Sequence, residues 1–486
     1  MRIWTPPALA WKNLNPDPKL GEGIDVMNSE AHLLPLGDFK PSDEWQTHVN
    51  EIFYGIQGPS IHDHFQTYVS QDHRLAHALA EDYFEKVLKQ ANCNRSRFIM
   101  EWGVGNGNLA GCFLSHLKSI DTDQQVYPNT RYILCDFSME ILKGVRKNSR
   151  LKNHPGKFFT IQIDANHMDC FRKQTINKII SNEIWDDLST KVLLKRDGSI
   201  YEEYIQPLID PVASGINTDD VIKPFKEKHL GSLKDYPHIL QFIIWERTYQ
   251  RVVIDDWPQV DVLQAHIDLL GDEIPVPINI GALATLKHAR YLLRQDGLGY
   301  TGMDYGMYSI RELNFSERPY FNIYGGQYTF MVNFELLNHW AHAEGFSSVE
   351  KELQHSYVGR HLQDRVISLV ELVQTHRDAP NMPSWDRDIL MLKTLNTLNK
   401  AYKSHYESKM KYKAMEGAPS HQQKQINELV GKLSINGVPD TVAYVTENEV
   451  IQVSADLARL GYDEQLYAPL FQGSTEPISF VVMNLS

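Results

Sequence analysis

The stretch FIMEWGVGNGNLAG (residues 98–111) constrains the fold more than any other part of the chain. Apolar residues typical of a buried strand run into Gly103, Gly105 and Gly107, and a helical pattern starts at Leu109. Glycines between a strand and a helix permit a sharp turn, and their backbone can lie against a nucleotide or nucleoside. The stretch therefore predicts a cofactor-binding turn in an α/β fold.

Two classes of cofactor fit such a turn. A dinucleotide fingerprint, G-x-G-x-x-G, needs its third glycine at position 108, where this chain has Asn108. The spacing here is G-x-G-x-G, as in motif I of methyltransferases that use S-adenosylmethionine (SAM), and Glu101 stands two residues before it. A carboxylate suits the sulfonium and amino cations of SAM and would repel a pyrophosphate. The residues thus favour SAM, with S-adenosylhomocysteine (SAH) as product, over a nicotinamide cofactor.

The predicted strands after the glycine turn also end in polar side chains. Asp136 follows the apolar run YILCD and suits the ribose hydroxyls, although the same residue could simply cap a helix. Asp164 is expected near the adenine and Asn182 near the transferred methyl group. Ligands of open α/β sheets bind at this carboxyl edge. The expected cofactor-binding residues are Glu101, Gly103, Gly105, Gly107, Asn108, Leu109, Asp136, Phe137, Ser138, Asp164, Ala165 and Asn182.

Alternating strands and helices indicate a Rossmann-like core with a mostly parallel sheet, helices on both faces and largely helical insertions. The predicted strands are 97–102, 131–136, 158–164 and 177–182, and the predicted helices include 72–92, 108–119, 138–148 and 282–295. The expected organisation is an N-terminal arm and helices (1–95), the SAM-binding half of the core (96–200), a substrate-side insertion read as helical and acidic (201–275), the second half of the core (276–345), a helical insertion or lid (346–437), and C-terminal strands and a helix that complete the core (438–486).

Several motifs, taken in order, resemble those of the MidA-type SAM methyltransferases, which include the mitochondrial protein arginine methyltransferase needed for complex I assembly. The matching segments are FQT (65–67), EWGVGNGNLAG (101–111), SNEIWDDLS (181–189), GMDYG (302–306) and GGQYTFMVNF (325–334). The resemblance spans roughly residues 58–345 and implies a class I methyltransferase core. Ser189, Tyr328 and Asn333 depart from the family pattern, which puts the substrate side in doubt.

The resemblance implies a protein arginine side chain as methyl acceptor. Transfer from a sulfonium requires close approach and alignment, and a cationic acceptor nitrogen must also lose a proton. Glu183 and Asp186, which match the family's N-E-x-x-D, are the expected catalytic acids. The expected substrate-side residues are Asp187, Gln327 and Thr67, and Asp304 could orient substrate or fix a turn.

Other interpretations stay open at this point. Asp186 and Asp187 could be an acidic pair at a helix N-terminus, favoured by the helix dipole. The acceptor could be a nitrogen or oxygen of a small molecule. The chain could also be a catalytically inactive scaffold with a methyltransferase fold.

Composition limits the partners, the cellular compartment and the metal sites that this chain is expected to have. The net charge of −13 argues against binding nucleic acid or an anionic membrane, and no apolar run is long enough to span a bilayer. The four cysteines form no C-x-x-C pair, which favours a reducing compartment, and we expect a cytoplasmic protein. The histidines and aspartates of IHDHFQTYVSQDH (61–73) fit no zinc spacing, so no metal is expected. A homodimer remains an open alternative.

Overall fold

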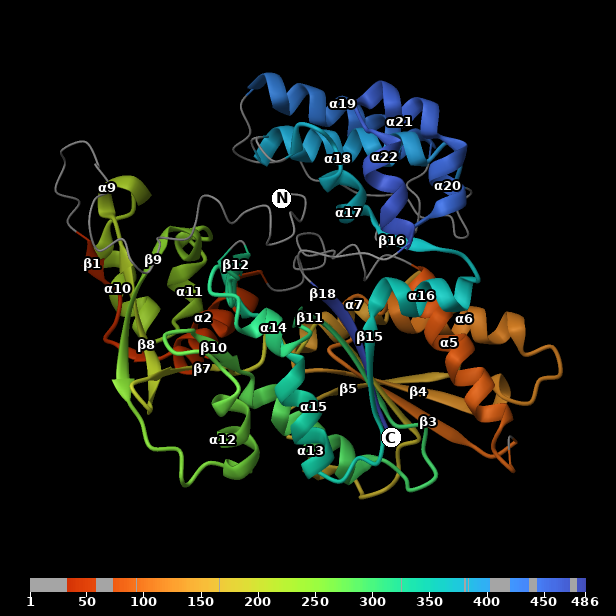
Figure 1. Cartoon of the computed structure of the whole chain (residues 1–486), viewed down its shortest axis with the longest axis horizontal. Helices are drawn as coiled ribbons and strands as arrows, with labels where there is room; N and C mark the ends of the chain where they lie inside the picture. Colours follow the sequence, from red (N-terminus) through yellow and green to blue (C-terminus); the bar gives the residue numbers. More distant parts are fainter. Residues whose placement is uncertain are drawn as a thin grey trace.

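A mostly parallel sheet forms the centre of the computed structural model (Figure 1), which describes residues 33–57, 73–92, 94–165, 167–324, 326–379, 382, 384–402, 420–436, 444–472 and 479–486. Its strands lie in the order β15 (Val349–Leu353), β18 (Ser479–Leu485), β11 (Tyr300–Met307), β6 (Lys178–Asn182), β3 (Arg97–Trp102), β4 (Thr130–Asp136) and β5 (Phe158–Gln162). Strand β18 runs antiparallel to both its neighbours, whereas β11, β6, β3, β4 and β5 are parallel. The predicted Rossmann-like α/β core is confirmed, and the predicted strands become β3, β4, β5 and β6.

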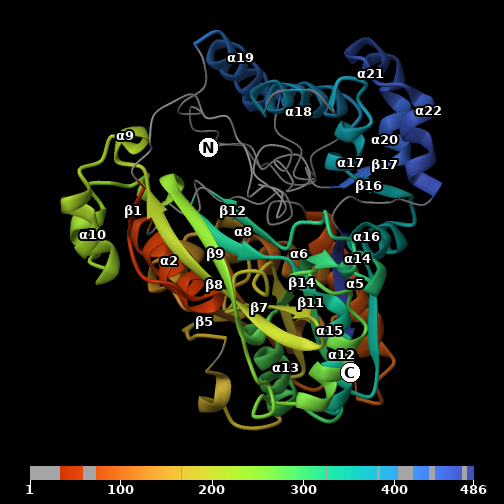
Figure 2. The same ribbon diagram turned by 60° about the vertical axis from the view of Figure 1, so that its left-hand side comes forward.

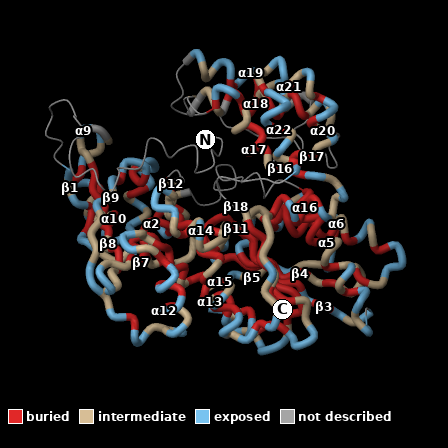
Figure 3. Tube along the Cα trace, viewed as in Figure 1, coloured by how far each residue is buried: buried red, intermediate tan, exposed pale blue. Residues whose placement is uncertain are grey.

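Helices cover both faces of this sheet because its side chains alternate between two cores. Ile99 of β3 packs in the core that includes α5 (His73–Leu88) and α6 (Asn108–Ile120). Met100 and Trp102, one position out of phase, pack in the core of α13 (Ile280–Leu292) and α15 (Phe334–Ala343). Figure 3 shows the central strands as the most continuously buried part of the trace.

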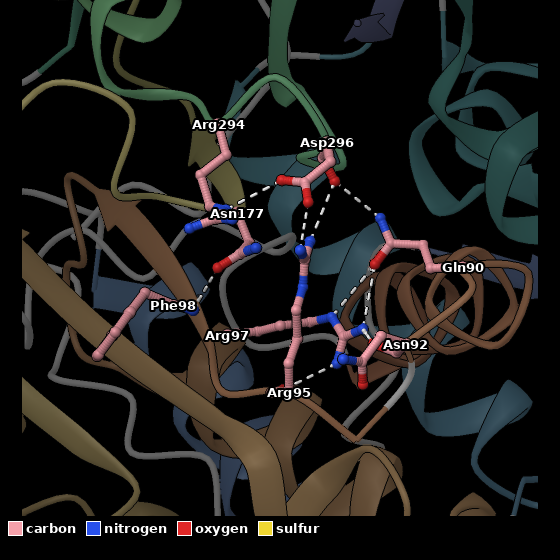
Figure 4. A network of polar contacts seen from close by, with 8 residues as sticks. All are labelled: Gln90, Asn92, Arg95, Arg97, Phe98, Asn177, Arg294 and Asp296. Atoms are coloured by element: carbon pink, nitrogen blue, oxygen red, sulfur yellow. Dashed lines mark hydrogen bonds and ion pairs between the residues drawn. The ribbon is translucent and has the colours of Figure 1, made fainter.

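A polar network links the loops at the edge of the sheet where the parallel strands begin (Figure 4). Asp296, in the loop before β11, pairs with Arg95 and accepts a hydrogen bond from Arg294 Nε at 3.0 Å. Asn177 Oδ1 accepts the Phe98 N–H at 3.0 Å and so joins the starts of β6 and β3. These contacts tie three loops together on the edge remote from the glycine turn.

The segment after β6 forms an antiparallel sheet, where the sequence had indicated a helical insertion. It contains β7 (Lys191–Arg196), β8 (Ser199–Ile209), β9 (Ile243–Arg251) and β10 (Val276–Ile278), and the N-terminal β1 (Leu34–Pro35) and β2 (Lys40–Pro41) pair with β8. The helical interpretation of this segment was wrong for β8 and β9, which pair along nine consecutive positions. The helices in and beside it are α9 (Pro211–Ser214), α10 (Thr218–Lys226), α11 (Leu230–Leu233) and α12 (Val260–Asp268). Figure 2 shows β8 and β9 side by side.

A second added segment lies between β15 and β18. It contains α16 (Gln354–Leu362), β16 (Val366–Ser368), α17 (Leu369–Gln374), α18 (Ser384–Leu398), α19 (Ser420–Asn436), β17 (Tyr444–Thr446), α20 (Glu447–Gln452), α21 (Ser454–Leu460) and α22 (Glu464–Tyr467). Strand β15 thus belongs to the sheet, although its range was expected to be a helical insertion. Within the described part of the range 438–486, which was expected to complete the core, only β18 lies in the central sheet.

This segment is anchored to the core by a partly buried ion pair. Arg74 of α5 pairs with Glu449 of α20 and donates to the Tyr444 carbonyl at 2.9 Å. Both views show α18 to α22 as a separate lobe above the sheet (Figures 1 and 2). None of the described helices is both long and apolar enough to cross a membrane.

Candidate active site

The glycine turn joins β3 to α6 and takes a left-handed backbone at all three glycines. Their φ angles are 68° at Gly103, 52° at Gly105 and 76° at Gly107, a region that residues with a Cβ rarely occupy. A Cβ at Gly103 would overlap the side chain of Ile184, and one at Gly107 would lie 2.9 Å from Leu151. A Cβ at Gly105 would meet no atom within 4 Å. Packing therefore explains Gly103 and Gly107, whereas Gly105 borders open space.

Glu101 is a buried carboxyl group on β3, two residues before this turn. It is 2% exposed, and its Oε2 has no hydrogen-bond partner among the described residues. Burial raises the pKa of Glu101 to about 8, and the neighbouring Tyr132 hydroxyl lowers it only in part. A buried acceptor without a donor costs free energy, so the Glu101 carboxyl group lowers the stability of the folded protein when no ligand is bound.

Asp136 ends the adjacent strand β4 and is also buried. Burial raises the pKa of Asp136 to about 7, against hydrogen bonds from the backbone N–H groups of Ser138, Gly105 and Phe137. The Ser138 N–H lies 2.9 Å from Oδ1, and Ser138 itself is the N-cap of α7 (Met139–Val145). Asp136 is therefore not the helix cap. Its bond with Gly105 places the carboxylate beside the glycine turn.

The remaining cofactor-side predictions occupy different surroundings. Asp164, beyond the end of β5, is half exposed, with the His167 ring 3.4 Å from its carboxylate, and Ala165 follows it at intermediate burial. Asn108 is buried and pairs with Arg150, while Leu109 packs in the core of α6. The side chains of Asn108 and Leu109 thus serve the helix interior.

The end of β6 carries a strained residue. Glu183 has a φ of 51°, which is uncommon for a residue with a side chain, and its N–H bonds the Met303 carbonyl at 2.8 Å. The preceding Asn182 has a buried Oδ1 with no partner in the part of the chain that the structure describes. A strained backbone at Glu183 and an amide oxygen of Asn182 that is unpaired among the described residues thus lie at the same edge as Glu101 and Asp136.

Asp186 lies in a turn between β6 and β7, so the helix N-terminus considered from the sequence is not present here. Its Oδ2 accepts from the Tyr305 hydroxyl at 2.6 Å, whereas the buried Oδ1 has no partner among the described groups. Burial, followed by the charges of Asp187 and Glu183, raises the pKa of Asp186 well above its usual range. Asp186 is therefore a buried acid with one free oxygen.

Asp304 fixes this turn, one of the two roles considered for it. Its Oδ2 accepts the backbone N–H groups of Trp185 at 2.8 Å and Asp186 at 3.3 Å. Its Oδ1 accepts the Tyr305 N–H at 2.8 Å. The carboxyl group is fully engaged with backbone, and burial raises the pKa of Asp304 as well.

The two substrate-side residues that can be placed bond to each other. Gln327 Nε2 donates to Asp187 Oδ1 at 3.0 Å. Thr67 and the FQT segment lie outside the described residues, as do all but the last residue of the histidine-rich segment 61–73. Asp187 interacts electrostatically with both Asp136 and Asp186, so the cofactor-side and substrate-side acids lie close together.

Comparisons with known proteins find distant similarities to solved structures. No family model and no curated protein matches the sequence. Two solved structures from Burkholderia thailandensis, an uncharacterized protein and a member of the same superfamily bound to S-adenosyl-homocysteine, each share 14% identity over 66% of this chain and 76% of theirs, with TM-scores of 0.45 and 0.44. A phosphoethanolamine N-methyltransferase from Haemonchus contortus shares 11% identity over 58% of this chain and 41% of its own, with a TM-score of 0.26.

Sequence reasoning missed the helix that covers this edge. Helix α2 (Ser42–Gln57) lies in the range expected to hold an N-terminal arm and helices, but no helix was predicted at these residues. Its Asn50 and Tyr54 both contact Asp187. The polar residues at 46, 50 and 54 recur every four positions, a helical period that could have revealed one face of α2.

The departures from the family pattern have structural roles. Tyr328 is buried, and its backbone bonds Asn50 in both directions. Asn333 caps α15 by accepting the Leu336 N–H at 3.0 Å. Ser189 lies 3.1 Å from the Thr47 hydroxyl. These replacements therefore contribute to packing and capping around the site.

Proposed function

We propose that this chain is a SAM-dependent methyltransferase of the MidA type. The observation that carries the proposal is a set of buried acceptor oxygens at the carboxyl edge, Glu101 Oε2, Asn182 Oδ1 and Asp186 Oδ1, which find no donor among the described residues. Buried polar atoms are nearly always hydrogen-bonded, so each such oxygen calls for a ligand donor. Two of the three are carboxylate oxygens, which favour a cationic ligand.

The residues present fit SAM better than a dinucleotide. Glu101 would hold the positive amino end of the ligand, and Asp136 would accept the ribose hydroxyls beside the open face of Gly105. Asp164 and Ala165, at the outer end of β5, would border the adenine. When bound, SAM supplies an electrophilic methyl group on a sulfonium. Acids aimed at a pyrophosphate would instead repel it.

The acceptor proposed here is a cationic nitrogen, with a protein arginine side chain as the preferred source and a small-molecule amine as the alternative. Asp186 presents a free oxygen in a buried position, and Glu183 lies three residues before it. Together they would orient the acceptor nitrogen for in-line attack. As the new nitrogen–carbon bond forms and the sulfur–carbon bond breaks, the nitrogen loses a proton, and the raised pKa of Asp186 suits it to accept that proton.

Calorimetry tests the cofactor first. We expect the protein to bind SAM and SAH, and binding of NAD(H) with neither sulfur ligand would refute the proposal. Methyl transfer from labelled SAM to arginine-containing peptides then tests the reaction. Glu183→Ala should retain SAH binding and lose turnover, whereas unchanged turnover would remove Glu183 from the chemistry.

A further inference from the structure

One face of α2 is built around the acidic turn that follows β6. Gln46, Asn50 and Tyr54 recur at intervals of four residues, so they project from the same side of the helix. Gln46 holds the turn's backbone, since its Nε2 donates to the Asp186 carbonyl at 3.2 Å and its Oε1 accepts the Thr190 N–H at 2.9 Å. Helix α2 therefore holds the backbone of the turn through Gln46, independently of the side chains of the turn.

The other two residues of this face bond the Asp187 carboxylate. Asn50 Nδ2 lies 2.5 Å from Asp187 Oδ1, and the Tyr54 hydroxyl donates to Oδ2 at 2.6 Å. From β13 (Gln327–Phe330), Gln327 Nε2 donates to Asp187 Oδ1 and to the Tyr54 hydroxyl, both at 3.0 Å. Both oxygens of Asp187 are thus engaged, in contrast to Asp186, whose Oδ1 finds no donor in the described structure.

This difference gives the two adjacent acids, Asp186 and Asp187, different roles. Hydrogen bonds from Tyr54 and Gln327 favour the charged form of Asp187 and act against burial, which raises its pKa. The negative charge of Asp187 in turn raises the pKa of Asp186, so the ionised Asp186 carboxylate binds a proton more readily. A fixed anion beside a carboxylate with a free oxygen is suited to hold a cation and to take up its proton.

Tyr54 also reaches the cofactor side. Its ring packs edge-on against Phe137, with centroids 5.2 Å apart, and Phe137 directly follows Asp136. The same side chain therefore contacts the loop expected to hold the ribose and the acid expected to serve the acceptor.

We propose that Tyr54 is a positioning residue of the acceptor site, which acts through Asp187 and leaves Asp186 as the carboxylate that contacts the acceptor nitrogen. This inference rests on the proposed function and deepens it. It removes Asp187 from direct contact with substrate and assigns a role to the N-terminal helix.

A double-mutant cycle tests the inference. The variants are Tyr54→Phe, Asp187→Asn, their combination and Asp186→Asn, and the probe is N-acetylarginine amide, titrated calorimetrically into each SAH-saturated protein. Thr47→Val is the matched control, because Thr47 on the same helix gives one hydroxyl contact to Ser189 of the same turn. SAH affinity and thermal stability are measured for every variant.

We expect Tyr54→Phe to weaken probe binding by about tenfold, as expected for the loss of one hydrogen bond to a charged group, with SAH affinity unchanged. In the Asp187→Asn background, Tyr54→Phe should change the affinity for the probe by less than about twofold. Asp186→Asn should abolish detectable probe binding, and Thr47→Val should match the wild type.

Three results would overturn the inference. Multiplicative effects of Tyr54→Phe and Asp187→Asn would show that Tyr54 does not act through Asp187. Full probe affinity in Tyr54→Phe, with lowered stability alone, would make the contact structural. A wild-type protein that binds SAH but not the probe would refute the cationic acceptor and this assignment together, whereas failure to bind SAH would refute the proposed cofactor.

Discussion

Replacing Glu101 by glutamine should stabilise the unliganded protein and weaken SAH binding at the same time. The carboxyl group is 2% exposed, and its pKa rises from 4.5 to about 8 through burial. Between these values the folded state binds a proton that the unfolded chain has released, so this group lowers stability progressively as pH rises. At about pH 7 the penalty is about 3 kcal/mol, from about 1.4 kcal/mol per pKa unit.

Glutamine keeps the shape of the side chain and removes the titration. We expect Glu101→Gln to raise the unfolding free energy at about pH 7 by up to about 3 kcal/mol, less the cost of burying the amide, and to have little effect at about pH 4. Urea unfolding of the unliganded protein at these two pH values measures this difference. Glu85→Gln, an exposed change on α5, is the control and should be neutral at both.

Ligand binding should change in the opposite direction. A cationic amino group needs the ionised form of Glu101, so binding below about pH 8 must release a proton, and SAH affinity should rise by up to about tenfold per pH unit between about pH 6 and 8. Calorimetry in buffers of different ionisation enthalpy counts that proton. Glu101→Gln should bind more weakly and lose this proton release. A glutamine variant that is less stable at neutral pH, or that binds SAH as the wild type does, would refute the reasoning.

Three further substitutions test the glycine turn, the acidic turn after β6 and the anchor of the segment between β15 and β18. Gly105→Ala should cost only about 1 kcal/mol of unfolding free energy, since a Cβ there meets no atom within 4 Å, but should weaken SAH binding by about tenfold or more in calorimetry because it enters the open space beside the turn. Asp304→Ala should lower the unfolding free energy by about 3 kcal/mol in urea, because several buried N–H groups lose their acceptor, and a change below about 1 kcal/mol would contradict this role. Arg74→Met should increase hydrogen exchange in residues 444–452, and unaltered exchange would show that the ion pair with Glu449 does not anchor this segment.

The central sheet could be predicted because its strands carry the simplest signal. Buried parallel strands read as continuous apolar runs, and FIMEW, YILCD and KIISN each do so beside a clear turn or helix start. The glycine turn, the acids of β3 and β4 and the acidic turn after β6 followed from the same signal. Their positions at strand ends are local properties of the sequence.

The antiparallel sheet escaped prediction because charged residues occupy some of its buried positions. Glu203 of β8 is fully buried and forms an ion pair with Arg247 of β9, with Nε and Oε2 3.6 Å apart. The Tyr320 hydroxyl donates to the same carboxylate at 2.5 Å. A charge at a buried position breaks the alternation of apolar and polar residues by which strands are recognised, and only the paired structure accounts for it.

The surroundings of Asp187 could not be predicted for a different reason. Its partners Asn50, Tyr54 and Gln327 lie more than a hundred residues away in the sequence, on either side of it. Asp187 and Gln327 were both expected on the substrate side, but no local pattern indicates that they bond each other. Long-range contacts of this kind are properties of the fold, so the roles of adjacent acids such as Asp186 and Asp187 can be separated only once it is known.

The topology also indicates where selectivity for the acceptor should reside. The antiparallel sheet begins after the carboxyl end of β6, and the hairpin of β12 (Phe321–Tyr324) and β13 follows the carboxyl end of β11. The segment between β15 and β18 leaves and returns at this same edge, because Leu353 pairs with Val481 there. All three additions therefore emerge where an open parallel sheet binds its ligands. A core that needed only SAM would gain nothing from chain added at this edge, whereas an acceptor must be enclosed and aligned there. We expect changes in these additions to alter acceptor affinity and leave SAH affinity intact.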